Sequence, residues 1–180
     1  MRRSTIPLTT LAWWSTLFLI LWAASWLRST SLRNDLPTNK DPDEPYYFLW
    51  ANAVKETGYP NAENGAGYPP GVLYLLAAEQ ITKDILRGGN VIPAIDYFVI
   101  GRMVSGLFGV LSVASTAKLG RIISHSPTVG IICALFAALS TLMVQESRRA
   151  NASAPWLFFT LLTFLFLWQS QKTHRLIFLY

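Results

Sequence analysis

The stretch PLTTLAWWSTLFLILWAASWL, residues 7–27, decides the class of this protein, because it has 21 residues and no charge. An α-helix needs about 20 residues to cross the roughly 30 Å of hydrocarbon in a bilayer. A cleaved signal peptide is the alternative, but its apolar part has only about 7–15 residues and ends at a small-residue cleavage site. This stretch is longer, rich in tryptophan and without a clear cleavage site. We therefore predict an uncleaved first transmembrane helix.

The rest of the chain has the composition of a membrane protein. Of its 180 residues, 52% are hydrophobic and only 14% are charged, whereas a soluble domain carries about 25% charged residues. Further apolar stretches predict transmembrane helices at about 94–117, 128–146 and 154–169. The predicted fold class is all-α, a polytopic transmembrane bundle with one long polar loop at about 28–93. Because the C-terminal LIFLY looks like the first turn of another helix, we expect the chain to be the N-terminal part of a longer transmembrane domain.

The distribution of Lys and Arg predicts the orientation of the bundle. An excess of these residues in short loops marks the cytoplasmic side. With the N-terminus in the cytoplasm, the short cytoplasmic segments hold six basic residues and the short outer loop holds two. The six are Arg2, Arg3, Lys118, Arg121, Lys172 and Arg175, and the two are Arg148 and Arg149. We therefore predict a multi-pass protein of a bacterial-type inner or plasma membrane, with residues 28–93 outside. The scattered basic residues do not suggest a nucleic-acid partner.

The long outer loop contains two predicted helices, at about 45–57 and 70–86, separated by a Gly/Pro/Asn segment. Both are too short and too charged to span, and both have an apolar side. They suit helices that lie in the membrane interface. In the second helix the expected apolar side is Leu73, Leu76, Ala77, Ile81 and Ile85, with Glu79, Lys83 and Asp84 on the other side.

The first of these helices is preceded by an acidic cluster in DPDEPYYFLW, residues 41–50. A carboxylate near aromatic rings and lipid has its pKa raised, which suits a base that removes a proton from a hydroxyl. The same residues can cap a helix N-terminus. Asp41 and Asp43 also have the Asp-x-Asp spacing of a divalent-cation site, because carboxylate oxygens are the ligands of hard cations. On residue types alone these alternatives stay open, and a solvated helix cap is the commonest of them.

The order of several motifs resembles a known family. A first helix is followed by Asp43-Glu44, then by Tyr68-Pro69-Pro70 before an amphipathic helix, and then by GRMVSGLFGV at 101–110 and SRRANAS at 147–153. This order is similar to that of the polyprenyl-phosphate-dependent glycosyltransferases with the GT-C fold. The closest branch is the protein-mannosyltransferase-like group, which includes the lipid A aminoarabinose transferases.

The resemblance implies a function. Members take a sugar from a polyprenyl-phosphate carrier and pass it, with inversion, to a lipid, glycan or protein acceptor at the extracytoplasmic face. An acid in the first outer loop acts as base, and that position matches Asp43, with Glu44 beside it. Tyr68 and Pro69 are implied to contact substrate. No cofactor is expected, although a divalent cation at Asp41 and Asp43 is an alternative. The sugar and the acceptor stay open.

Three arginines are candidate phosphate ligands, because a guanidinium binds phosphate through paired hydrogen bonds. Arg148 and Arg149 lie at the outer end of the third predicted span, where lipid-headgroup anchoring is the alternative. Arg102 lies about two turns into the second span, where a charge needs a partner. Asp43 or a bound phosphate would serve, so a structural pair and a substrate contact both stay open.

A second class of function also fits this composition. A truncated relative, a transporter segment or a scaffold would be a non-catalytic membrane module that at most binds polyprenyl lipid. A transporter carries its polar residues in mid-span, whereas the acids here are concentrated in the loop at 28–93. This distribution favours the glycosyltransferase.

Overall fold

The computed structural model describes residues 8–30, 32–34, 36, 42–60, 69–86, 88 and 94–173. These residues form helices and no strand, which confirms the predicted all-α class. The helices are α1 (Leu8–Ser29), α2 (Glu44–Thr57), α4 (Pro70–Leu86), α5 (Ala94–Ser124), α6 (Pro127–Leu139), α7 (Thr141–Ser147) and α8 (Ser153–Thr173).

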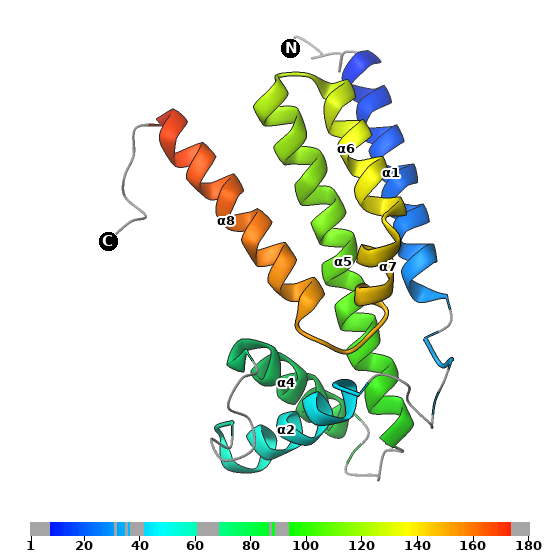
Figure 1. The fold of residues 1–180 in the computed structure, drawn as a ribbon, viewed down its shortest axis with the longest axis vertical. Coiled ribbons are helices and arrows are strands. Elements are labelled where there is room, and N and C mark those ends of the chain that lie inside the picture. Colours follow the sequence, from blue (N-terminus) through cyan, green and yellow to red (C-terminus); the bar gives the residue numbers. More distant parts are fainter. Residues whose placement is uncertain are drawn as a thin grey trace, which may run out of the picture.

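Three of these helices, α1, α5 and α8, are long and apolar enough to cross a membrane, and α6 and α7 together form a bent fourth candidate. The central helix is α5, which packs against α1, α6, α7 and α8. In Figure 1, α1, α5 and α6 run side by side, while α8 leans away from them toward its C-terminal end. The N-terminus of α1 and the pair α2–α4 lie at opposite ends of the molecule (Figure 1). We call the second of these the α2–α4 end.

Small residues let the transmembrane helices approach closely. A Cβ added at Gly120 of α5 would lie 2.9 Å from the sulfur of Cys133, and one at Gly130 would lie 2.7 Å from the carbonyl of Ala117. Such close backbone approach is how helices gain packing contacts inside a membrane. The buried apolar residues of this bundle are Trp13, Leu17, Ala24, Val113, Ala117, Ala134, Ala137 and Ala138.

The third predicted span, about 128–146, is not one continuous helix. It breaks at Ser140, where α6 and α7 meet at a 60° bend. Ser140 has φ −57° and ψ 115°, outside the helical region, and its hydroxyl accepts a hydrogen bond from the amide of Met143. The carbonyls of Ala137 and Ala138, which the break releases, accept hydrogen bonds from the Arg28 guanidinium. Buried backbone groups freed by a break must be satisfied, and Arg28 does this here.

The two predicted loop helices are present as α2 and α4, and they share a small apolar core. It comprises Tyr47, Trp50, Ala51, Val54, Val72, Leu73, Leu76, Ala77 and Ala152. The buried side of α4 is rotated from the predicted one: Ile81 and Ile85 are exposed, while Glu79 is half-buried. The reason is that α4 packs on both α2 and α5, so the side that includes Gln80 is covered.

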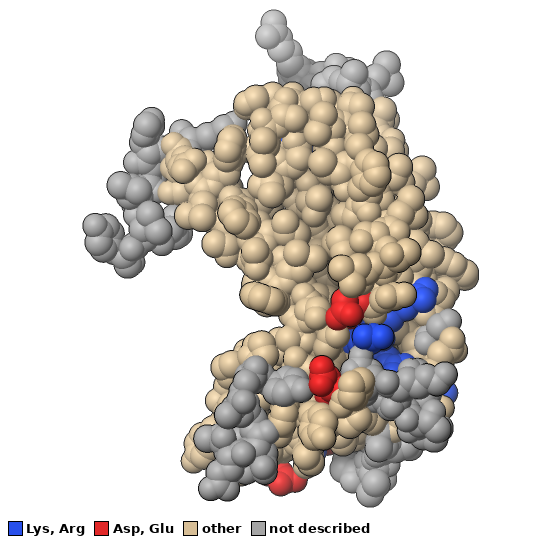
Figure 2. Space-filling model, viewed as in Figure 1, with Lys and Arg blue, Asp and Glu red and all other residues tan. Residues whose placement is uncertain are grey.

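On one face of the molecule, charged side chains are concentrated where these two parts meet (Figure 2). On the face drawn in Figure 2, the upper part of the bundle shows no Lys, Arg, Asp or Glu among the described residues. The blue and red side chains lie at and below the junction with α2 and α4. On this face the charged residues are therefore gathered at the α2–α4 end, whereas Arg121 of α5 lies over the ring of Trp13, toward the opposite end of the bundle.

Candidate active site

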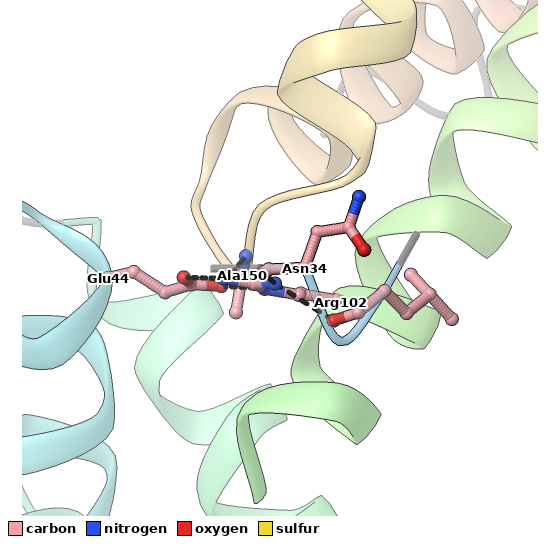
Figure 3. A network of polar contacts seen from close by, with 5 residues as sticks. Asn34, Glu44, Arg102 and Ala150 are labelled. Carbon is pink, nitrogen blue, oxygen red and sulfur yellow. Dashed lines mark hydrogen bonds and ion pairs between the residues drawn. The ribbon is translucent and has the colours of Figure 1, made fainter. Parts of the chain in front are cut away.

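Glu44 is the first residue of α2 and is fully buried. Its Oε1 accepts hydrogen bonds from Arg102 Nε and from the backbone amide of Ala150, both at 2.8 Å. Its Oε2 accepts from Arg102 Nη2 at 2.7 Å. Figure 3 shows the two side chains pointing toward one another beside Ala150. Three donors therefore hold this carboxylate, which a buried charge requires.

Arg102 is also nearly fully buried, at 3% exposure, and lies on α5. Besides Glu44, its Nη1 donates to the carbonyls of Leu32 and Asn34, at 2.8 and 3.1 Å. The partner that this arginine was predicted to need is thus Glu44, the neighbour of Asp43. One guanidinium joins α5, the start of α2 and the chain that follows α1.

Asp43 precedes this network and is exposed. It occupies the N-cap position of α2, but its side chain makes no capping hydrogen bond. Its carbonyl accepts hydrogen bonds from the amides of Tyr46 and Tyr47. Because the adjacent Glu44 is anchored, the backbone fixes the position of Asp43, which is exposed as a residue. Asp41 lies outside the described residues, so the divalent-cation site stays a prediction.

The two neighbouring arginines at the end of α7 have different surroundings. Arg148 is half-buried, and its Nε donates to the carbonyl of Leu27 at 2.9 Å and its Nη2 to the hydroxyl of Thr30 at 2.8 Å. Arg149 is exposed and forms an ion pair with Glu146 at 3.5 Å. The structure therefore ties Arg148 to the end of α1 and leaves Arg149 on the surface.

Arg28 is a buried charge to which the sequence analysis assigned no role. It is 1% exposed, and its guanidinium donates to the Ser147 hydroxyl and to the carbonyls of Ala24, Ala137 and Ala138. These four acceptors, one hydroxyl and three carbonyls, are all neutral. The available signal was a single arginine at the end of an uncharged 21-residue stretch, which does not distinguish a buried position from a flanking anchor.

Several cavities adjoin this region, and two of them bear on the predicted substrate contacts and arginines. One, of about 200 Å³, lies between α1 and α5, and both Arg28 and Arg102 line it. The other is an apolar groove of about 440 Å³ between the start of α4, α5 and the start of α8. Pro69, Val72, Phe108 and Trp156 are among its lining residues. Of the predicted substrate contacts, Pro69 therefore borders a groove, and Tyr68 lies outside the described residues.

A polar cluster at the other end of α4 joins three helices. Asp84 forms an ion pair with Lys55 of α2 and accepts a hydrogen bond from the Tyr97 hydroxyl of α5 at 2.7 Å. Two hydrogen bonds lower the pKa of Asp84, and the one from Lys55 has a larger effect than the one from Tyr97. Both donors favour the ionised carboxylate. The cluster helps to place α2 and α4 on α5.

Comparison with protein families found one whose description fits this architecture. Residues 70–177, more than half of the chain, match the family model for dolichyl-phosphate-mannose-protein mannosyltransferase. The match includes Arg102, Arg148 and Arg149 and begins after Asp43 and Glu44. No curated protein and no solved structure matches the chain. The chain belongs to the dolichyl-phosphate-mannose-protein mannosyltransferase family, whose members are membrane glycosyltransferases of the GT-C kind.

Proposed function

We propose that this protein transfers a sugar from a polyprenyl-phosphate carrier to a hydroxyl acceptor at the extracytoplasmic face, with Asp43 as the base. The observation that carries the proposal is the buried Glu44–Arg102–Ala150 network, which anchors the residue next to an exposed carboxylate. A base must be held in position while its carboxylate stays accessible to the acceptor. The α2–α4 end meets both requirements.

The proposed reaction is a single displacement at the anomeric carbon. The acceptor oxygen forms a bond to this carbon as its proton passes to Asp43, and the bond to the carrier phosphate breaks. Attack from the face opposite the leaving group inverts the configuration. Polyprenyl phosphate leaves with the bonding electrons. Arg149 is exposed on the loop that follows α7, and a guanidinium there would stabilise the phosphate charge.

The apolar groove supports a lipid carrier as the donor. Its lining by Pro69, Val72 and Phe108 is almost entirely apolar, and it lies beside the start of α8. An isoprenoid chain seated in this groove would bring its phosphate to the α2–α4 end. The arginine-lined cavity between α1 and α5 lies at the same end of the bundle.

The test is sugar transfer by the full-length protein in membranes, with Asp43→Asn as the variant. Asparagine keeps the size of the side chain but removes its basicity, and loss of a general base costs about 10²–10⁴ in rate. Glu56→Gln, at an exposed carboxylate later in α2, is the matched control. Full activity of Asp43→Asn would overturn the assignment of the base. Binding of polyprenyl phosphate without transfer by the unaltered protein would favour a non-catalytic lipid-binding module.

The roles of the two arginines after α7 can be distinguished in the same preparation. Arg149→Gln should weaken binding of polyprenyl phosphate, because one charge-assisted hydrogen bond contributes about 1.5–3 kcal/mol. Arg148→Gln should instead lower thermal stability, since Arg148 holds Leu27 and Thr30. Equal lipid affinity of Arg149→Gln and the unaltered protein would leave Arg149 as a headgroup anchor.

A further inference from the structure

Glu79 is a half-buried carboxylate that the proposed reaction does not use. Its Oε2 is buried and has no hydrogen-bond partner among the described residues. An unpaired buried polar atom costs free energy, and an unpaired charge costs more. Glu79 therefore needs either a proton or a partner.

The surroundings of Glu79 explain why an ionised form is disfavoured there. It lines a small cavity together with Phe48, Phe98 and the buried residue Glu44. The cavity has about 10 Å³ of space, which is near the minimum for one water molecule. A second negative charge near a carboxylate disfavours its ionised form, so the shared cavity adds to the effect of burial on Glu79.

Among the described residues around this cavity, Lys83 offsets the charge of Glu79 only in part, and the other polar groups are neutral or bound to different partners. From α4 itself come Gln80, which is neutral, and Lys83, whose amine lies over the ring of Tyr97. From α5 come Tyr97, whose hydroxyl donates to Asp84, and Arg102, which is engaged by Glu44. From the loop before α8 comes Ala150, whose amide also donates to Glu44. Burial raises the pKa of Glu79 to about 7, and the charge of Lys83 partly opposes this rise.

We propose that Glu79 is a proton-binding site that controls how firmly Arg102 and Ala150 hold Glu44. The protonated carboxyl is neutral beside Glu44 and can donate its hydrogen to Gln80 or to a water in the cavity. Loss of this proton places a second negative charge beside Glu44. The ionised side chain then competes for Arg102 or turns outward toward Lys83, and either movement loosens the packing of α4 on α5.

Two measurements on the full-length protein in lipid nanodiscs test the proposal without measuring transfer. Infrared titration from about pH 5 to about pH 9 follows protonated carboxyl groups, whose unperturbed pKa values lie near 4. We expect a band that disappears with a midpoint near 7, that is absent in Glu79→Gln and that persists in Glu56→Gln. If Glu79→Gln leaves every band above pH 6 unchanged, the proton-binding site is overturned.

Amide hydrogen exchange of the segment that contains Ala150 tests the coupling to Glu44. After correction for the intrinsic pH dependence, exchange should become several-fold faster above pH 7 in the unaltered protein and in Glu56→Gln. It should stay constant in Glu79→Gln, or in Glu79→Leu if the first variant does not fold. Equal exchange in the unaltered protein and the Glu79 variants at every pH would overturn the coupling.

The relevance of this proton to catalysis rests on the proposed function, whereas the proton-binding site does not. Full activity of Asp43→Asn would overturn the assignment of Asp43 as the base, but it would not change the results expected from the two Glu79 measurements. An unchanged infrared titration in Glu79→Gln would overturn the proton site and leave the role of Asp43 as proposed. The two failures are therefore distinguishable.

Discussion

Arg102 and Glu44 are 58 positions apart in the chain, yet they form a two-pronged ion pair in which both side chains are almost completely buried. Arg102 belongs to a candidate membrane span, and Glu44 begins a helix of the α2–α4 end. A charge in a span is costly unless it is paired. The same pair attaches α2 to the bundle beside the proposed base.

The first prediction concerns this pair. Glu44→Gln or Arg102→Gln alone should lower the free energy of unfolding by about 3–5 kcal/mol, because each leaves an uncompensated buried charge. The double variant should lose less than the sum of the two, with a coupling of about 0.5–3 kcal/mol. Unfolding by denaturant of the protein in detergent micelles measures all three. Strictly additive losses would mean that the pair contributes no coupling.

A second prediction concerns Arg28. Arg28→Lys should destabilise the protein by roughly 2 kcal/mol or more, because an ammonium cannot reproduce the planar set of hydrogen bonds and leaves buried carbonyls unpaired. The matched control is Arg33→Lys, whose side chain is 75% exposed and forms one long ion pair with Asp96. That change should cost less than about 1 kcal/mol. Equal thermal stability of the two variants would contradict the role given to Arg28.

A third prediction tests the packing around the same arginine. A Cβ at Gly109 would lie 2.5 Å from the Ser147 hydroxyl and 2.7 Å from Arg28 Nε. Gly109→Ala should therefore lower the melting temperature, since overpacking costs about 1–3 kcal/mol. Gly71→Ala is the control, because a Cβ there would meet nothing within 4 Å. In a helix that change should be neutral or stabilising by up to about 1 kcal/mol.

A fourth prediction concerns stability in acid. The pKa of Asp84 is lowered by its hydrogen bonds to Lys55 and Tyr97, so the folded protein binds a proton there less readily than the unfolded chain. Its contribution is present above the ordinary value of 3.8 and is lost as the pH falls below it. In Asp84→Asn, the free energy of unfolding should therefore fall less steeply as the pH drops below 3.8. The Glu56→Gln profile should keep the slope of the unaltered protein, and an unchanged slope in Asp84→Asn would exclude this contribution.

Glu79 should affect stability in the opposite direction. Its pKa is raised from 4.5 to about 7, so the folded protein binds this proton more readily than the unfolded chain. Stability should fall as the pH rises from 4.5 through 7, and Glu79→Gln should remove that fall. Thermal unfolding across this range measures the difference. A fall of equal size in both proteins would show that other groups cause it.

The last prediction concerns orientation. In a Cys133→Ser background, a cysteine at position 64 should react with a membrane-impermeant reagent in intact cells. A cysteine at Ser124, at the far end of α5, should react only after the membrane is opened. The six-to-two bias of Lys and Arg is the physical reason. The reverse pattern would overturn both the topology and the outer placement of Asp43.

The sequence by itself determined the helical class, the two loop helices and the acidic residues at the start of α2. These features depend on local properties: uncharged runs long enough for a bilayer, apolar periodicity, and Gly and Pro as helix breakers. The helices α2 and α4 begin within one residue of their predicted starts. None of these three features depends on a contact with a distant residue.

The tertiary structure decided which charged groups meet. Arg102 reaches Glu44 across 58 positions, Ala150 donates to Glu44 across 106, and Arg28 reaches Ser147 across 119. Helical periodicity predicts that Glu79 lies on the polar side of its helix, but packing against α2 and α5 leaves it half-buried beside a small cavity that Glu44 also lines. The break at Ser140 is likewise accommodated by a side chain from α1. Whether a charge is buried depends on the donors and acceptors that folding brings around it, and no local pattern contains that information.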